Sequence, residues 1–87
     1  MKDALQMLTQ ENVATLLHTT RDSVTMLREA GVLKATKIGK HYMYSQSGIS
    51  EFQQDYAGLD VSNVYRAMES KQIVEEKKKQ SHQTLLR

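Results

Sequence analysis

The chain has 87 residues, no cysteine and a formal net charge of +2. This length supports one small hydrophobic core, and without cysteine the chain has neither disulfide bonds nor thiolate metal ligands. No stretch near the N-terminus is apolar enough for a signal peptide or a membrane span. We therefore expect a cytoplasmic protein with no membrane partner.

The positive charge is concentrated in two segments. Residues 1–60 carry six Lys and Arg against seven Asp and Glu, whereas residues 61–87 carry six against three. Within the first part, residues 21–42 hold five basic and two acidic side chains. Such modest basic patches release few counterions from nucleic acid, so a single copy is expected to bind DNA weakly.

The first long helix is predicted to begin after Thr9, a residue type that favours the N-cap. Val13, Leu16 and Leu17 then follow at the spacing of one buried helical face. A short helix over Ala4–Met7 is expected to precede it.

A second helix is predicted over Arg21–Ala30, with Thr20 as its N-cap and Gly31 as its C-cap. Val24 and Leu27 are its inward pair. Two short helices joined by about three residues are typical of a helix-turn-helix. The alternative is a helical hairpin that belongs to some other core.

The alternation of residues after this helix predicts a β-hairpin. A three-residue loop over 39–41 places Ile38 opposite Tyr42 and Thr36 opposite Tyr44, so that the apolar side chains share one face. A two-residue loop would divide the apolar set between both faces. The pattern therefore favours the longer loop, with Lys37 on the opposite face and a basic tip.

Two further helices are predicted after the hairpin. Ser45 or Ser47 caps a third helix that ends near Tyr56, and Asp60 caps the last helix. From Ser70 onward the last helix is expected to project from the domain or to fray. The apolar stripe that should face the core on this helix consists of Val61, Val64, Tyr65 and Met68.

These elements predict a mainly α protein with a small β-hairpin, arranged as a winged helix-turn-helix with an added C-terminal helix. Residues 1–58 would form the DNA-binding domain, and residues 59–87 a C-terminal helix with a basic tail around Lys77–Lys79.

Several short motifs between residues 8 and 56 occur together in one pattern. They are Leu8-Thr9, Val13-Ala14, Leu16-Leu17, Arg21 followed by Ser23-Val24, Leu27-Arg28-Glu29-Ala30-Gly31 and Lys37-Ile38-Gly39-Lys40 followed by Tyr42. With these motifs residues 8–56 resemble the excisionase-type winged helix, which is related to the MerR DNA-binding domain. His18 stands where that family usually has a glycine in the turn, and histidine tolerates the left-handed region better than most residues.

The resemblance implies an accessory factor of a phage or mobile element that acts on DNA in a bacterial host cell. Proteins of this type bind repeated sites cooperatively, bend the DNA and steer an integrase towards excision, and some also repress transcription. The implied partners are double-stranded DNA, neighbouring copies of the chain and an integrase.

The candidate DNA-binding residues lie on the second helix and on the hairpin. Arg21 and Arg28 are long enough to reach guanine edges or phosphates, and Lys40 would track phosphates from the hairpin tip. Met26 has two interpretations, a contact to a thymine methyl or a side chain folded back onto the hairpin. The complete set is Thr20, Arg21, Asp22, Ser23, Thr25, Met26, Arg28, Lys37, Lys40 and His41.

An enzyme is not expected, nor is a metal or a cofactor. His18, His41 and His82 are scattered, and the sequence has no glycine-rich phosphate loop and no metal-ligand spacing. Two alternatives to an excision factor remain. One is a plain transcriptional repressor without a role in recombination, and the other is an adaptor that uses the same fold for protein contacts.

Overall fold

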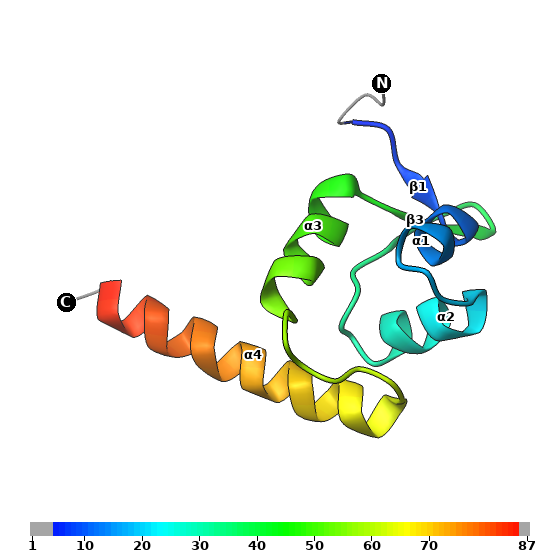
Figure 1. Ribbon diagram of the computed structural model, residues 1–87. Helices are drawn as coiled ribbons and strands as arrows, with labels where there is room; N and C mark the ends of the chain where they lie inside the picture. Colours follow the sequence, from blue (N-terminus) through cyan, green and yellow to red (C-terminus); the bar gives the residue numbers. More distant parts are fainter. Residues whose placement is uncertain (1–4, 86–87) are drawn as a thin grey trace.

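The computed structural model describes residues 5–85, with side chains defined up to residue 79. Over this range the chain is mostly helical, with four helices and one three-stranded antiparallel sheet (Figure 1). The elements are β1 (Leu8–Thr9), α1 (Gln10–Leu16), α2 (Arg21–Glu29), β2 (Thr36–Ile38), β3 (His41–Tyr44), α3 (Gln46–Asp55) and α4 (Val64–Leu85). The mainly α architecture with a hairpin is confirmed.

The start of the described chain differs from expectation. Residues 5–7 are not helical, so the predicted short helix is wrong there, and residue 4 lies outside the described range. Instead, Leu8 and Thr9 form β1, which pairs with the end of β3 through Leu8 opposite Tyr44. The sheet order is therefore β1-β3-β2, and the hairpin is held at its base by a third strand.

Side-chain caps define the starts of α1 and α2. The Thr9 hydroxyl accepts a hydrogen bond from the Asn12 N–H, and the Asn12 side chain accepts one from the Thr9 N–H, both at 3.1 Å. The Thr20 hydroxyl accepts from the Ser23 N–H at 3.1 Å. Both predicted N-caps are confirmed, and each satisfies a backbone donor that the helix itself leaves unpaired.

The turn between α1 and α2 depends on a left-handed residue. His18 has a φ of 56°, a conformation that glycine would adopt without strain. The Thr19 N–H then donates to the Ala14 carbonyl at 2.8 Å, which closes the turn. Val13, Val24 and Leu27 can therefore meet in the core, where each is at most 5% exposed.

Replacing His18 by glycine is expected to raise the free energy of unfolding by about 0.5–1 kcal/mol. The left-handed conformation costs a non-glycine residue about 1–2 kcal/mol, and the greater freedom of glycine in the unfolded chain offsets part of that gain. Urea unfolding followed by circular dichroism measures the change. Thr19→Gly is the matched control, because its φ is not positive and the substitution should destabilise the protein. Equal effects from both would contradict the assignment of strain to His18.

The predicted register of the hairpin is wrong. The observed pairs are Ile38 with His41, Lys37 with Tyr42, and Thr36 with Met43. The loop therefore has two residues, and Gly39 has a φ of 65° at the first position, as a type II′ turn requires.

The physical reason for this register is that Ile38 does not belong to the core face. Its side chain is 53% exposed, whereas Tyr44 is completely buried. Tyr42 and Tyr44 share one face of β3 because alternate residues of a strand point the same way. The shorter loop places Lys37 on that face, opposite Tyr42, and not on the other face as expected.

The third helix agrees with its prediction. The Ser45 hydroxyl accepts from the Gly48 N–H at 3.0 Å, which identifies Ser45 as the N-cap, and Tyr56 is the C-cap. Ile49 is 3% exposed, and Phe52 packs against the core next to it.

The start of α4 differs from the prediction. Its first turn is capped by Asn63, whose side-chain oxygen accepts from the Arg66 N–H at 2.9 Å. Asp60, the predicted cap, lies outside the helix and accepts hydrogen bonds from the N–H and hydroxyl of Ser62. These hydrogen bonds hold the pKa of the Asp60 carboxyl below its usual value.

The face that α4 presents to the core also differs. Val64, Tyr65 and Met68 are 52%, 67% and 58% exposed, so most of the predicted apolar stripe faces away from the core. Val61 alone packs against it, from a position before the helix. The buried residues of α4 are Ala67, Ser70 and Val74.

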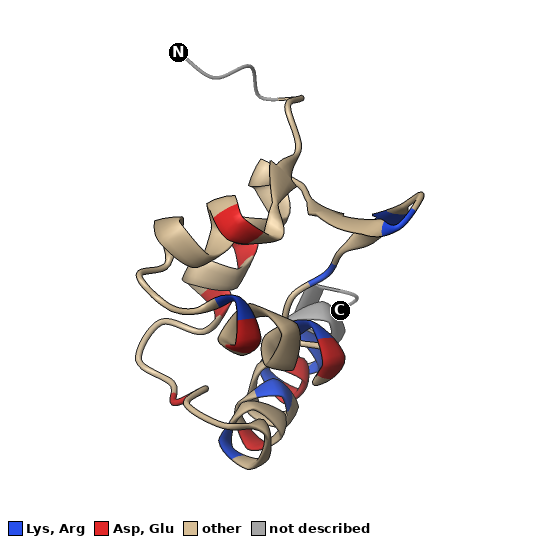
Figure 2. Ribbon diagram, turned by 90° about the vertical axis from the view of Figure 1, so that its right-hand side faces the viewer, with Lys and Arg blue, Asp and Glu red and all other residues tan. Residues whose placement is uncertain are grey.

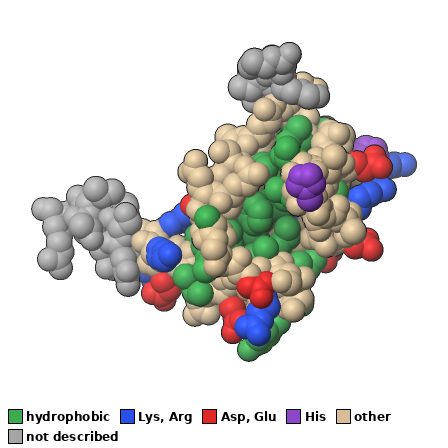
Figure 3. Space-filling view, viewed as in Figure 1, with side chains coloured by type: hydrophobic (Ala, Val, Ile, Leu, Met, Phe, Trp, Pro, Cys, Tyr) green, Lys and Arg blue, Asp and Glu red, His purple; other side chains and the backbone are tan. Residues whose placement is uncertain are grey.

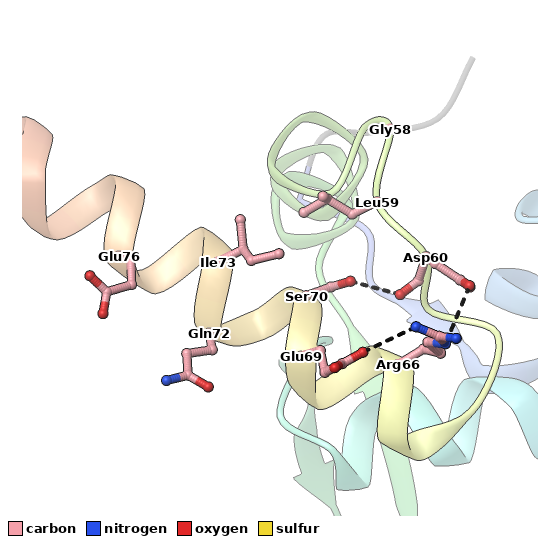
Figure 4. A pocket seen from close by; sticks show the side chains of 9 residues that line it. All are labelled: Gly58, Leu59, Asp60, Arg66, Glu69, Ser70, Gln72, Ile73 and Glu76. Carbon is pink, nitrogen blue, oxygen red and sulfur yellow. Dashed lines mark hydrogen bonds and ion pairs between the residues drawn. The ribbon is translucent and has the colours of Figure 1, made fainter.

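Small and polar residues hold α4 in place. The Ser70 hydroxyl donates to the Asp60 carbonyl at 2.7 Å, while Arg66 lies between the Asp60 and Glu69 carboxylates (Figure 4). Farther along, Lys78 pairs with Asp55 of α3 at 2.8 Å, and this carboxylate raises the pKa of Lys78. Contact with the rest of the protein therefore extends past Ser70, where the sequence predicted that the helix would leave the domain.

The core reaches the surface on one face of the molecule. Figure 3 shows hydrophobic side chains gathered in the middle of that face, between α3 and the α1–α2 pair. A shallow hollow there is lined in part by Leu17, Leu27, Phe52 and Val61. The β2–β3 hairpin projects from the side of the molecule that lies away from α4 (Figure 1).

Candidate functional site

A groove between the hairpin and the first turns of α1 and α2 brings together three of the predicted site residues. Arg21, at the start of α2, lies across the groove from Lys40 and His41 of the hairpin. All three side chains are exposed. The groove encloses about 610 Å³ and is also lined by Thr9, Gln10, Glu11, Ile38, Tyr42 and Met43.

Gln10 fixes the position of α2 at the floor of this groove. Its side-chain Nε2 donates to the Thr25 hydroxyl at 2.6 Å and to the Arg21 carbonyl at 3.0 Å. Its Oε1 accepts from the Tyr44 hydroxyl at 3.5 Å. Sequence reasoning missed Gln10, because its partners lie 11, 15 and 34 residues away and no local pattern marks it.

The outward side of α2 is polar at its N-terminal end. Thr20 donates to the Ser23 hydroxyl at 3.1 Å, so these two predicted site residues are bound to each other. Asp22 is exposed in the first turn, where a carboxylate interacts favourably with the helix dipole. Thr25 is half-buried with its hydroxyl held by Gln10.

Two predicted site residues of α2 face inward more than expected. Met26 is half-buried and packs against the core. Arg28 is also half-buried, and its guanidinium carbon lies 3.7 Å from the centre of the Tyr42 ring. The Lys37 ammonium lies 5.8 Å from the same ring centre. Tyr42 therefore has cationic groups of α2 and of β2 within the range of a cation–π interaction.

Tyr44 lies on the same face of β3 as Tyr42, is completely buried and is also close to Arg28. Burial raises the pKa of the Tyr44 hydroxyl, and the nearby Arg28 guanidinium partly offsets that rise. The hairpin is thus joined to α2 through both tyrosines of β3, and to α1 through Gln10.

The charge on this side of the molecule is mixed. Figure 2 shows basic positions along the projecting hairpin, with acidic positions on the helices beside it. Glu11 lines the same groove as Arg21 and Lys40. The groove is therefore suited to an extended anionic ligand, such as a phosphate backbone, that meets separate cations along its length. The nearby carboxylate limits how strongly any one anion is held.

Among the side chains described, those of residues 5–79, no three His, Cys, Asp or Glu residues are grouped so that they could hold a metal ion. No helix between residues 5 and 85 combines the length and the apolar character needed to cross a membrane.

Comparisons of the chain with protein-family models, with curated proteins and with solved structures found no match.

Proposed function

We propose that the chain is a sequence-specific DNA-binding protein of the winged helix-turn-helix type. In this proposal α2 enters the major groove, and the β2–β3 hairpin is the wing that follows the neighbouring backbone or minor groove. The observation that carries it is the groove in which Arg21 faces Lys40 and His41. A phosphate strand that runs between the two DNA grooves would pass between the Arg21 and Lys40 cations.

The orientation of α2 supports the same proposal. Its buried side is formed by Val24 and Leu27, and its exposed residues are Arg21 and Asp22 at the N-terminal end and Glu29 at the C-terminal end, so the first turn is open to a ligand. In a helix-turn-helix the N-terminal residues of the second helix meet the base edges. Here those residues are Arg21, Asp22 and Ser23, two of which are exposed and polar.

We further propose that several copies act together on one DNA. Arg21, Lys37 and Lys40 are the basic residues of the proposed interface that remain exposed. Three phosphate contacts give only modest affinity at physiological salt. Neighbouring copies raise the effective concentration of each other without any new contact to DNA, as in the excisionase-type proteins that the sequence resembles.

The test of DNA binding is selection from a pool of random DNA duplexes, followed by gel-shift titration of the selected sequence. Enrichment of one short sequence, bound more tightly than a scrambled duplex of equal length, is the expected result. Arg21→Ala should weaken that binding. If no sequence is enriched and the selected pool binds wild type and Arg21→Ala equally weakly, the proposal is wrong. The protein-interaction adaptor is then favoured.

Replacing Lys40 by alanine is expected to weaken binding to all sequences alike. Each phosphate contact contributes about −0.9 to the slope of log affinity against log salt, so the slope should change from about −3 to about −2. Lys77→Ala is the matched control, because it removes the same charge from an exposed position of α4. Equal changes of slope in both variants, or a loss confined to one base pair, would contradict a phosphate contact by Lys40.

Footprinting of the DNA around the gene separates excision from simple repression. We expect several evenly spaced sites beside an attachment site, because weak single-site binding requires neighbouring copies. A single palindrome over a promoter would instead identify a plain repressor that binds as a dimer.

A further inference from the structure

The environment of Arg28 differs from that of the exposed cations in the groove. Its guanidinium carbon lies 3.7 Å from the centre of the Tyr42 ring, which is van der Waals contact over the face of the ring. Arginine is suited to this arrangement because its planar cation stacks on aromatic rings. The contact joins the last turn of α2 directly to the middle of β3.

The inner edge of the guanidinium is closed to solvent. The Arg28 Nε is buried and, among the described residues, has no hydrogen-bond acceptor. A buried donor without a partner is uncommon, so other interactions of the side chain must offset its cost. These are the stack on Tyr42 and a side-chain hydrogen bond between Arg28 and the Tyr44 hydroxyl. A base edge cannot reach the buried Nε, and the side chain would have to leave the ring before it could bind a base with its full fork of donors.

A second set of contacts also links α2 to β3. Gln10 connects Thr25 of α2 to Tyr44 of β3. Tyr42 and Tyr44 lie two residues apart on one face of β3, so both side chains that face the helices are tied to α2. β1 also supports the hairpin at its base, where Leu8 and Thr9 pair with the end of β3.

From these contacts we infer that Arg28 is a positioning residue that fixes the hairpin relative to α2 by stacking on Tyr42, and does not itself read a base. The inference rests on the proposed function, because the hairpin and α2 must fit two neighbouring DNA grooves at once. It replaces the expectation, drawn from the position and length of its side chain, that Arg28 contacts guanine edges or phosphates.

The test compares variants on both sides of the stack. Arg28→Lys keeps the charge but removes the planar group, and Tyr42→Leu keeps an apolar side chain but removes the ring. Each should weaken binding to the selected duplex about tenfold, and the double variant should lose no more than the weaker-binding single variant. Tyr42→Phe should restore the affinity that Tyr42→Leu loses, because the ring alone forms the stack.

The pattern of base specificity distinguishes positioning from reading. If Arg28 positions the hairpin, both variants should weaken binding to every single-base variant of the site by the same factor. If Arg28 reads a base, Arg28→Lys should relax specificity at one base pair, Tyr42→Leu should not, and the two losses should add. That result would overturn the inference.

A measurement without DNA keeps this test separate from the proposed function. Amide hydrogen exchange of residues 36–44 should become faster in Arg28→Lys and in Tyr42→Leu, while exchange in the interior of α3 stays unchanged. Unchanged exchange in the hairpin would overturn the inference even if the protein binds DNA. If the wild-type protein binds no DNA, the proposed function fails, and faster hairpin exchange still supports the structural role of Arg28.

Discussion

Replacing Tyr44 by alanine is expected to lower the free energy of unfolding by about 3–5 kcal/mol. The side chain is completely buried, and it is the largest residue of the core that is fully inaccessible to solvent. Its removal leaves a cavity where β1, β3 and the helices meet. A domain of this size has a total stability of about 5–10 kcal/mol, so the variant should be close to unfolding at 37 °C.

Urea unfolding of the wild type and two variants tests this expectation. Tyr44→Phe is the control, because it keeps the ring and removes only a hydroxyl whose hydrogen bond to Gln10 is 3.5 Å long. A loss of about 1 kcal/mol or less is expected for this variant. If Tyr44→Ala cost no more than Tyr44→Phe, Tyr44 would not be the central residue of the core.

Introducing a carboxylate at Ala67 is the second large expected effect. Ala67 is 0% exposed and belongs to the core, so Ala67→Glu would bury a charge without a partner. Such a charge costs about 3–5 kcal/mol, and undocking of α4 is the route by which the protein can avoid that cost. We therefore expect that α4 separates from the core and that its amides lose protection from hydrogen exchange.

This variant also tests the division of the chain near residue 58, which remains a prediction. If residues 1–58 fold independently, the amides of α1, α2 and α3 should stay protected in Ala67→Glu, and DNA binding should persist. Loss of protection throughout would show that α4 is an integral part of the core. Met68→Glu is the matched control, because Met68 is 58% exposed and its substitution should change stability by about 0.5 kcal/mol or less.

The sequence predicted those features of the fold that depend on local chemistry. Thr9 and Thr20 were identified as N-caps, and Ser45 as one of two candidates, because a cap requires only a hydroxyl and a backbone N–H three residues later. Val24 and Leu27 were placed in the core by their helical spacing alone. These relations span fewer than five residues, so no tertiary contact can override them easily.

Features that depend on tertiary contacts were predicted less well. The hairpin register was wrong because Ile38 was assumed to be a core residue, whereas β1 and Tyr44 define the buried end of the sheet. The buried face of α4 was wrong because it consists of the small residues Ala67 and Ser70 together with Val74, whereas the prediction followed the larger apolar side chains at the start of the helix. Small residues on this face let α4 approach the core closely, and a search for apolar side chains alone does not find them.

In the candidate site, too, the sequence predicted the residues marked by local features and missed the contacts that depend on tertiary structure. Arg21, Lys40 and His41 were selected from sequence by charge and position, and the structure brings them to one groove. The contact between Arg28 and Tyr42 depends on the two-residue loop, which sequence reasoning did not favour. The role of Gln10 depends on partners in α2 and β3, so it becomes visible only when these elements are placed in space.

The position of β2 has a consequence for how copies of the protein can meet. β2 is an outer strand of the sheet, has only three residues, and carries Lys37 at its centre. Short outer strands with a central lysine resist the edge-to-edge pairing that leads to aggregation. If several copies bind one DNA as proposed, they would therefore stay separate folded units, and their contacts would be made by side chains and helices without a continuous intermolecular sheet.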